Sequence, residues 1–258
     1  MSKISVIVPY YKGNKYLDTL KMSLDAACSN YPDEVEVVLV NDSPNDQVIY
    51  KNIKSDKYDL VLVNHSQNQG IHQARVTGLD KSSGEYILFL DQDDKINEKF
   101  FSEMAPVLDE DYSVAFTFAN GVFEDENGNS KLILNSFGKV YGVKNYKTLL
   151  NVGNLLASPG QCLIRKSCIP VQWTENIMKT NCADDYFLWL LMAKGHNARY
   201  VNRVLYEHIT TGENTSGNRI TGYKSDLELY QILDKLNIFS DSEMNRFCLL
   251  YTSDAADD

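Results

Sequence analysis

The sequence predicts an α/β fold that is doubly wound around a mostly parallel central sheet, with a smaller mixed part in its second half. Three observations predict this class. Near-continuous apolar runs suit strands that are covered on both faces, helix-like segments alternate with these runs, and polar residues follow each run. The 258 residues, 43% of them hydrophobic, are enough to bury a sizeable core.

Four β-rich apolar runs in the first half are predicted strands, at 4–11, 35–42, 59–65 and 86–91. Two helices are predicted between them. The first, over 15–28, places Leu17, Leu20, Leu24 and Ala27 on one stripe, and the second, over 70–84, ends with glycine as helices often do. Ligands of open α/β sheets bind outside the carboxyl ends of the strands, so the polar residues that follow these four strands predict a site at one rim.

The second half has a different pattern. It predicts a hairpin from 113–123 and 131–137, further strands at 161–169 and 198–209, and helices at 183–195 and about 221–236. A polar, Gly-containing loop at 210–219 is predicted to be mobile. Because no internal repeat or linker interrupts the chain, we expect a single domain over 1–247, with a nucleotide-binding half at 1–110 and an acceptor-side half at 111–247.

Charge and cysteine content exclude several classes of protein. The net charge is -10 and the Lys and Arg residues are scattered, which argues against a nucleic-acid track and against a membrane-surface patch. The apolar run at the N-terminus is too short for a signal peptide, and no run reaches the length of a membrane span. The five cysteines lack CxxC spacing, which favours reduced thiols and a cytoplasmic protein.

The last eleven residues, "CLLYTSDAADD" at 248–258, are interpreted as a translated sequencing adapter. The native C-terminus is then expected to be missing, and peripheral association with the inner face of the cell membrane would run through the lost segment. A genuine short acidic tail is the alternative.

The stretch "EYILFLDQDD" delivers three carboxylates, Asp91, Asp93 and Asp94, at the end of an apolar run. If the strand persists, Asp91 and Asp93 project to the same side. Such carboxylates are hard oxygen ligands that suit Mg²⁺ or Mn²⁺, and a cation would remove the like-charge penalty. The alternative is an acidic N-cap for a helix that starts at Asp94.

Five ordered segments resemble the family 2 glycosyltransferases, which have the GT-A fold, a Rossmann-like fold, and are inverting enzymes that use nucleotide-sugar donors. These are "VIVPYYKGNKYL", "VLVNDSPND", "NQGIHQARVTG", "FLDQDD" and "ADDYFLWLLMAKG". The resemblance extends from Ile4 to about Ser216. Two departures lie in the second segment, where Asn41 replaces the first acid of the family pattern and Ser43-Pro44 replaces Gly-Ser.

The resemblance implies a donor site formed by Pro9, Tyr11, Asp42, Asn68, Arg75, Asp91 and Gln92. In this reading Asp42 accepts a hydrogen bond from a uracil-type base and Tyr11 stacks on its ring, while Arg75 lies near the phosphates. Asp93 is the main metal ligand, Asp91 contacts ribose or metal, and His208 is a further metal ligand. The alternatives are a turn-forming Asp42, a packing Tyr11, a solvated Arg75 and a structural His208.

The resemblance also implies that Asp185 is the general base, with Asp184 standing where the family more often has Glu. An aspartate is ionised at pH 7 and can take a proton from an acceptor hydroxyl. The alternative is that both acids only stabilise the start of a helix through its dipole. Gly160 and Gln161 are expected to face the acceptor sugar, Trp173 to lie on the acceptor-side surface, and Trp189 to lie in the core.

The sequence therefore predicts a glycosyltransferase that is inverting and assisted by Mg²⁺ or Mn²⁺. It is expected to move a sugar from a nucleotide-sugar, with UDP as the expected nucleotide, to a glycan or lipid-linked acceptor in bacterial surface polysaccharide synthesis. Two alternatives stay open: a sugar nucleotidyltransferase, which would normally want a Gly-rich basic loop, and a catalytically silent module that binds nucleotide-sugars.

Overall fold

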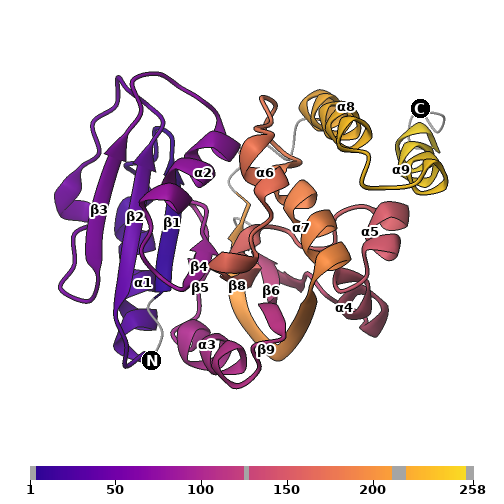
Figure 1. The fold of residues 1–258 in the computed structure, drawn as a ribbon. Helices are drawn as coiled ribbons and strands as arrows, with labels where there is room; N and C mark the ends of the chain where they lie inside the picture. The colour runs from indigo at the N-terminus through magenta and orange to yellow at the C-terminus, as the bar shows by residue number, and fades with distance from the viewer. Residues whose placement is uncertain (1–3, 125–127, 211–218, 254–258) are drawn as a thin grey trace.

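The computed structural model describes residues 4–124, 128–210 and 219–253, and one mixed sheet runs through it (Figure 1). The first half forms four parallel neighbours in the order β3-β2-β1-β4. These are β3 (Asp59–Asn64), β2 (Val35–Asn41), β1 (Ile4–Tyr10) and β4 (Tyr86–Phe89). Helices α1 (Leu17–Ser29) and α2 (Ile71–Lys81) lie between them in the chain, so the predicted α/β alternation is confirmed.

The second half continues the sheet with mixed directions. β8 (Cys162–Arg165) runs antiparallel to β4 and to β6 (Val114–Glu124), and β9 (Asn197–Ile209) runs parallel to β6. β5 (Lys95–Ile96) pairs with β9 at the edge. The predicted hairpin is confirmed as β6 with β7 (Ser130–Leu132), although its second strand is shorter than expected.

The helices of the second half are α3 (Phe100–Glu110), α4 (Phe137–Val143), α5 (Tyr146–Val152), α6 (Val171–Glu175), α7 (Asp184–Gly195), α8 (Arg219–Leu236) and α9 (Asp241–Ser253). Three short 3₁₀ turns, η1 (Tyr50–Asn52), η2 (Pro159–Gln161) and η3 (Lys166–Cys168), complete the elements. The helices predicted at 183–195 and 221–236 are confirmed. The loop predicted at 210–219 lies almost entirely outside the described residues.

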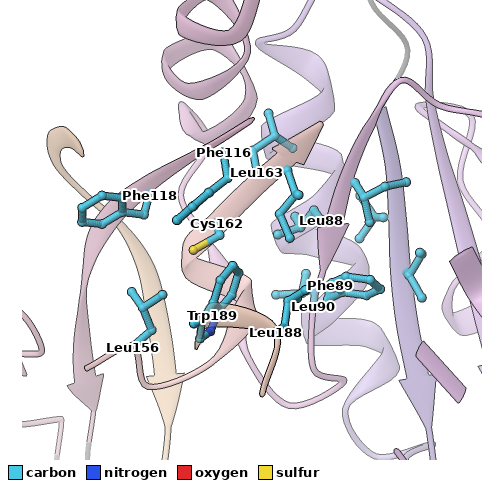
Figure 2. Packing of buried hydrophobic residues seen from close by; sticks show 14 of the residues in the cluster. Leu88, Phe89, Leu90, Phe116, Phe118, Leu156, Cys162, Leu163, Leu188 and Trp189 are labelled. Carbon is cyan, nitrogen blue, oxygen red and sulfur yellow. The ribbon is translucent and has the colours of Figure 1, made fainter. Parts of the chain in front are cut away.

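The core positions helix α7 against the second half of the sheet. α7 is apolar on all sides, as expected of a fully buried helix, and its residues from Asp184 to Met192 are all buried. Trp189 is 1% exposed, and its ring centre lies 5.5 Å from that of Phe116. Figure 2 shows both side chains within the buried cluster. The prediction that Trp189 is a core residue is confirmed. Burying α7 fixes the position of the two acids at its N-terminus.

Several boundaries differ from the prediction. α2 ends at Lys81, where Ser82 turns to an extended conformation, so Gly84 is not its C-terminal residue. Gly84 instead allows close packing, because a Cβ there would lie 2.7 Å from the backbone nitrogen of Ser5. β4 ends at Phe89, so the acids that follow it are not part of the strand. α3 begins at Phe100 with Lys99 at its N-cap, so Asp94 is not a helix cap and that alternative is wrong.

Candidate active site

A cavity of about 670 Å³ opens at the carboxyl ends of β1, β2 and β4. The starts of α2 and α7, the segment before η2 and the end of β9 complete its walls. Its lining includes Pro9, Tyr11, Asp42, Asn68, Arg75, Asp91, Gln92, Asp93, Asp184, Asp185 and His208. The ends of β1, β2 and β4 therefore converge on one rim, as predicted, whereas Asn64 and His65 at the end of β3 do not line the cavity.

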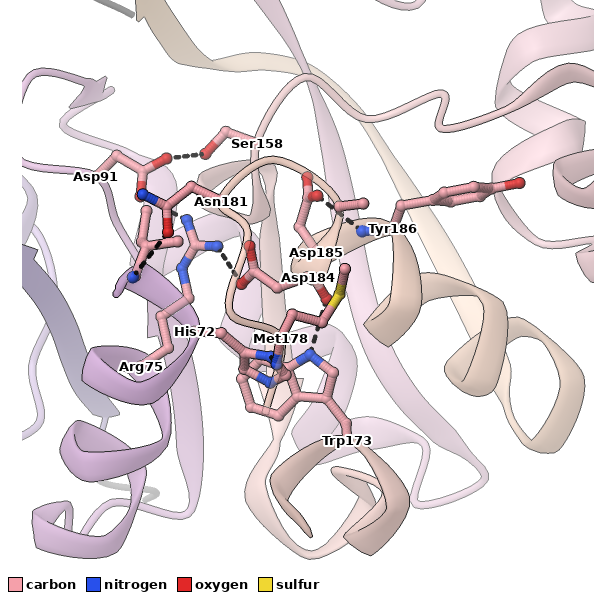
Figure 3. Close-up of polar contacts among 12 residues, drawn as sticks. His72, Arg75, Asp91, Ser158, Trp173, Met178, Asn181, Asp184, Asp185 and Tyr186 are labelled. Atoms are coloured by element: carbon pink, nitrogen blue, oxygen red, sulfur yellow. Dashed lines mark hydrogen bonds and ion pairs between the residues drawn. The ribbon is translucent and has the colours of Figure 1, made fainter. Parts of the chain in front are cut away.

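A buried arginine connects two acids in this cavity (Figure 3). Arg75 Nη1 donates a 2.6 Å hydrogen bond to Asp184 Oδ2, and its Nη2 donates a 2.6 Å hydrogen bond to Asp91 Oδ1. Ser158 Oγ donates to the other oxygen of Asp91 at 3.1 Å. Because Arg75 is only 3% exposed, it is not a solvated charge. Its terminal nitrogens serve two carboxylates of the protein.

Asp93 and His208 face the same cavity, and Asp94 lies behind them. Asp94 is 1% exposed; it accepts a hydrogen bond from Tyr206 Oη and lies 3.1 Å from His208 Nδ1. Engaging Nδ1 in this way orients the ring and leaves Nε2 as the nitrogen that can act as a ligand. Burial, with the charges of Asp94 and Asp91, raises the pKa of Asp93 to about 7.

His208 is held by the same carboxylate. Burial alone would lower the pKa of His208, but the hydrogen bond with Asp94 and the charges of Asp94, Asp91 and Asp93 raise it above its ordinary value. The imidazolium form is thus stabilised by the neighbouring acids.

The donor set around Asp93 fits a divalent cation that a phosphate ligand completes. The described residues contain no ready group of three or more His, Cys, Asp or Glu side chains that could enclose a metal by themselves. Mg²⁺, however, is usually bound by one or two carboxylates together with substrate phosphates and water. Asp93 supplies one such carboxylate and His208 adds a ring nitrogen, whereas both oxygens of Asp91 accept hydrogen bonds from Arg75 and Ser158.

Asp185 presents a buried carboxylate at the start of α7. Its Oδ1 accepts a hydrogen bond from the Tyr186 nitrogen at 2.7 Å, and its Oδ2 accepts one from Asn154 Nδ2 at 3.0 Å. Burial, followed by the charge of Asp184, raises the pKa of Asp185 to about 7 against the opposing charge of Arg75. A carboxylate with such a pKa is suited to accept a proton near neutral pH.

Asp184 is committed to structural contacts. In addition to the Arg75 ion pair, its backbone oxygen accepts a 2.8 Å hydrogen bond from Trp173 Nε1. Trp173 is fully buried and its ring centre lies 4.5 Å from that of His72, so the prediction that Trp173 lies on the surface is wrong. An indole that is buried needs a partner for its N–H, and the carbonyl at the start of α7 provides one.

Asp42 ties the end of β2 to the loop before α2. Its Oδ1 accepts hydrogen bonds from the Gln69 nitrogen at 2.8 Å and lies 2.7 Å from His65 Nδ1, and its Oδ2 accepts one from the Gly70 nitrogen at 2.8 Å. Asn68 Nδ2 donates to the Asp42 backbone oxygen at 3.2 Å. Gly70 has φ +87, a backbone conformation that favours glycine. A side chain at this position would therefore strain the loop that Asp42 holds.

Tyr11 and Gln92 are adjacent residues of the cavity lining. Gln92 Oε1 accepts a hydrogen bond from the Tyr11 nitrogen at 3.0 Å, and Gln92 Nε2 donates to the Tyr11 oxygen at 3.1 Å. The Tyr11 ring is 49% exposed. Gln92 therefore fixes the backbone after β1 while the phenol ring of Tyr11 stays accessible to a ligand.

Gly160 and Gln161 lie behind the cavity wall instead of facing an acceptor. Gln161 is fully buried; its Nε2 donates to the Ala119 oxygen at 3.1 Å and its Oε1 accepts from the Ala157 nitrogen at 2.8 Å. A Cβ at Gly160 would lie 2.6 Å from the Tyr206 ring. The cavity surface here is formed by the residues just before them, at 157–159. Their role is therefore supporting, which corrects the prediction.

The sequence did not point to three side chains that contribute to the site. Asn154 contacts the candidate base, Ser158 contacts Asp91, and Asn181 Oδ1 accepts a 3.3 Å hydrogen bond from the Ile71 nitrogen. All three lie in irregular segments, where periodicity gives no signal. For Asn181 alone the sequence held an indication: it lies three residues before the acids Asp184 and Asp185, which were predicted to be at the site.

The fold and the site together define an α/β protein of the nucleotide-binding type, with an acid-lined cavity at the carboxyl ends of parallel strands. Residues 5–169, more than half of the chain, match the family model described as Glycosyl transferase family 2. The chain belongs to this family.

Two relatives illustrate the range of similarity. The chain is 26% identical over 269 aligned positions to the GalNAc(5)-diNAcBac-PP-undecaprenol beta-1,3-glucosyltransferase of Campylobacter jejuni, which covers 99% of this chain and 82% of that protein. It is 36% identical over 119 residues to the poly(ribitol-phosphate) beta-N-acetylglucosaminyltransferase TarS of Staphylococcus aureus. The second match covers 44% of this chain but only 20% of TarS.

The structural comparison agrees with the family assignment. The crystal structure of S. aureus TarS 1-349 in complex with UDP-GlcNAc superposes with a TM-score of 0.70 and 20% sequence identity. The match covers 96% of this chain and 71% of that chain. The predicted GT-A fold is thereby confirmed. Among the described residues, no helix combines the length and the apolar character that crossing a membrane would require.

Proposed function

We propose that this glycosyltransferase transfers a sugar, with inversion, from a UDP-sugar to a hydroxyl group of a glycan or lipid-linked acceptor in bacterial surface polysaccharide synthesis. One observation carries the proposal: the acids after β4 and the carboxylate of Asp185 line the same cavity. A donor diphosphate near Asp93 and an acceptor hydroxyl near Asp185 can therefore meet there.

The residues support a single displacement. Asp185 removes the proton from the acceptor hydroxyl as its oxygen bonds to the anomeric carbon, the bond from that carbon to the diphosphate breaks, and the nucleoside diphosphate leaves with the electron pair. Attack from the face opposite the leaving group inverts the anomeric centre. Arg75 keeps Asp184 and Asp91 in place, and Asn154 orients the base.

Asp93 and His208 are the residues that would hold Mg²⁺ or Mn²⁺. When bound, such an ion acts as a Lewis acid that stabilises negative charge on the departing diphosphate. The raised pKa of Asp93 is consistent with this role, because burial and the charges of Asp94 and Asp91 disfavour its ionised form and a bound cation would offset that effect.

The nucleotide and the acceptor class are supported by the relatives. TarS was crystallised with UDP-GlcNAc, and the Campylobacter relative is named for a lipid-linked substrate. Tyr11, whose exposed ring lies at the cavity mouth, is the residue we propose to stack on the base. Asp42 is proposed to contact the base through whichever of its acceptor sites the loop at 69–70 leaves open.

A donor panel tests the proposal. The protein is incubated with UDP-, GDP- and dTDP-sugars, with and without Mn²⁺, and release of the nucleoside diphosphate is measured alongside donor binding by calorimetry. We expect Mn²⁺-dependent hydrolysis of at least one UDP-sugar. Binding without turnover would support a silent binding module. Release of pyrophosphate from a nucleoside triphosphate and a sugar phosphate would support a nucleotidyltransferase.

A further inference from the structure

The middle of the chain contains a long stretch with no acidic residue. Residues 127–174 include Lys131, Lys139, Lys144, Lys147, Arg165 and Lys166 but no Asp or Glu, in a protein whose net charge is -10. The lysines are too widely spaced in the sequence to register as a cluster, which is why the sequence predicted no membrane-surface patch. The structure brings part of this stretch together in two short helices.

Helices α4 and α5 pack against each other at one end of the molecule, far from β3 (Figure 1). α4 turns Gly142 and Val143 inward, and a Cβ at Gly142 would lie 2.5 Å from the Leu155 side chain. Its opposite face carries Phe137, which is 84% exposed, and Tyr141, which is 56% exposed. These two residues are four positions apart and therefore neighbours on the helix surface.

Two exposed lysines follow these rings in the chain. Lys144 caps the C-terminus of α4, and Lys147 lies in the first turn of α5, with its Nζ 5.9 Å from the centre of the Tyr146 ring. Lys139 points back to the Ile133 oxygen and is not part of this surface. We call Phe137, Tyr141, Lys144 and Lys147 the α4 face. Aromatic rings that protrude beside lysines are the composition of helices that lie in a membrane interface.

The α4 face is connected directly to the cavity. α5 packs against α7, which carries Asp185, and the segment that follows α5 supplies Asn154 to that carboxylate. Glu243 of α9, an acid that contacts α5, accepts hydrogen bonds from Tyr146 Oη and the Ser240 nitrogen and hydroxyl. A partner bound to the α4 face would therefore lie on the side of the cavity where the candidate base is found.

We propose that the α4 face docks the protein on an anionic lipid bilayer, with Phe137 and Tyr141 inserted among the headgroups and Lys144 and Lys147 paired with lipid phosphates. Charge complementarity identifies the partner: the acid-free stretch gives this acidic protein a basic surface, and exposed aromatic rings add an apolar contact that a soluble polyanion does not need. The proposal does not rest on the transferase activity.

Vesicle binding tests the proposal. The full chain is sedimented with vesicles of phosphatidylcholine alone and of an equimolar mixture with phosphatidylglycerol, at low and high salt. We expect binding to the mixture only, weakened by salt. Phe137→Ser with Tyr141→Ser should reduce the affinity by at least about tenfold. Lys144→Gln with Lys147→Gln should reduce it by roughly tenfold or more, since each basic residue at an anionic surface contributes about fivefold.

A matched control uses residues that are equally exposed on other elements. Tyr112, 80% exposed, and Met22, 72% exposed, are changed to serine, and binding should be unchanged. A second readout is the fluorescence of a tryptophan introduced on the α4 face. On addition of vesicles, the emission of Phe137→Trp should shift to the blue and be quenched by brominated lipid, and that of Tyr112→Trp should not change. All these positions are exposed, so a normal melting temperature confirms that each variant is folded.

Three results would overturn the proposal. These are no sedimentation with either vesicle, equal losses in the control variant, or binding to soluble polyphosphate without binding to vesicles. The last result would identify the α4 face as a site for an acidic polymer, which is a different partner. None of them bears on the donor panel, so failure here leaves the proposed transferase function to be judged separately.

Discussion

Arg75 and Asp184, 109 residues apart in the sequence, are joined by a 2.6 Å hydrogen bond in which both side chains are buried. Arg75 also donates to Asp91, so one guanidinium compensates an acid that follows β4 and an acid of α7. The pair fixes the helix that carries the candidate base relative to the strands that form the candidate donor site. The geometry of the candidate site therefore depends on an arginine whose terminal nitrogens are taken by protein carboxylates.

Replacing Arg75 by glutamine should both destabilise the protein and abolish transfer. The change leaves two buried carboxylates without their cation, and breaking a buried ion pair in this way costs about 3–5 kcal/mol. Thermal or urea unfolding measures the loss. The double variant with Asp184→Asn should recover part of the stability because it removes one of the stranded charges, but it should not recover activity.

An exposed ion pair provides the control for this variant. Arg199 Nη2 lies 3.3 Å from Asp111 Oδ2 at the surface, and Arg199→Gln should leave both unfolding and activity unchanged. If Arg75→Gln were no more harmful than Arg199→Gln, the buried network would have no structural importance.

The pH dependence of transfer should follow the ionisation of Asp185. Burial raises the pKa of this carboxyl to about 7, and the base acts only when it is deprotonated. The turnover rate should therefore rise with pH through about 7 and level off above it. A rate that is constant between pH 5 and 8 would show that another group accepts the proton.

Asn154 gives a sharper test of the same assignment. Its amide donates a 3.0 Å hydrogen bond to Asp185 Oδ2 and so favours the charged form of the acid. Asn154→Ala should move the rise in the pH profile to higher pH and lower the rate by about tenfold, because a hydrogen bond to a charged group contributes about 1.5 kcal/mol. Asn151→Ala, at an exposed position on α5, should leave the profile unchanged. A lower rate with an unmoved profile would indicate a merely structural role for Asn154.

The strands and the site rim could be predicted because their signals are local. An apolar run followed by polar residues identifies β1, β2 and β4 and the end of each at which a ligand binds. The acids at the start of α7 could be predicted for the same reason. They stand directly before the apolar run of the helix in the sequence, so they mark its N-terminus. What positions these side chains is not local.

The partners of the site residues come from distant parts of the chain, which no periodicity reveals. The sequence left open whether Arg75 lies near the phosphates or is a solvated charge, and only the folded chain shows that it pairs with Asp91 and Asp184. Trp173 lies in a short helix without a clear pattern, and its burial depends on the carbonyl of Asp184. Gln161 was expected to face the acceptor sugar, whereas its amide bonds to the backbone groups of Ala157 and Ala119.

Packing of α2 on the sheet should be sensitive at Gly78. A Cβ at this position would lie 2.3 Å from Ile7 Cγ2 and 3.3 Å from Val40 Cγ2, so Gly78→Ala forces the helix and sheet apart. Overpacking of this kind costs about 1–3 kcal/mol, which unfolding measures. Gly222→Ala is the control, because nothing lies within 4 Å of its Cβ and alanine favours the helix. Gly222→Ala should be neutral or stabilising, and equal destabilisation by both variants would contradict the packing argument.

Metal binding should depend on Asp93 and be assisted by His208. Addition of Mn²⁺ together with UDP should raise the melting temperature of the protein, and a chelator should reverse the rise. Asp93→Asn should abolish the rise, because the amide lacks the charge that holds the ion. His208→Ala should weaken it, because it removes the ring that Asp94 orients. Transfer should fall in the same order.

The melting temperature of the metal-free protein gives an independent test of Asp93, in which Asp93→Asn is expected to stabilise the protein. The pKa of Asp93 is raised to about 7 by burial and by the nearby acids, so this residue contributes stability that is fully present below its ordinary pKa of about 3.9 and is lost as pH rises through about 7. Asp93→Asn removes that loss, and at pH 8 without metal it should melt higher than the unchanged protein, by about 2–4 °C for each kcal/mol gained. Asp111→Asn, at the surface, should show neither effect. A variant at Asp93 that melts lower at pH 8 and still responds to Mn²⁺ and UDP would show that the acid cluster is not the metal site.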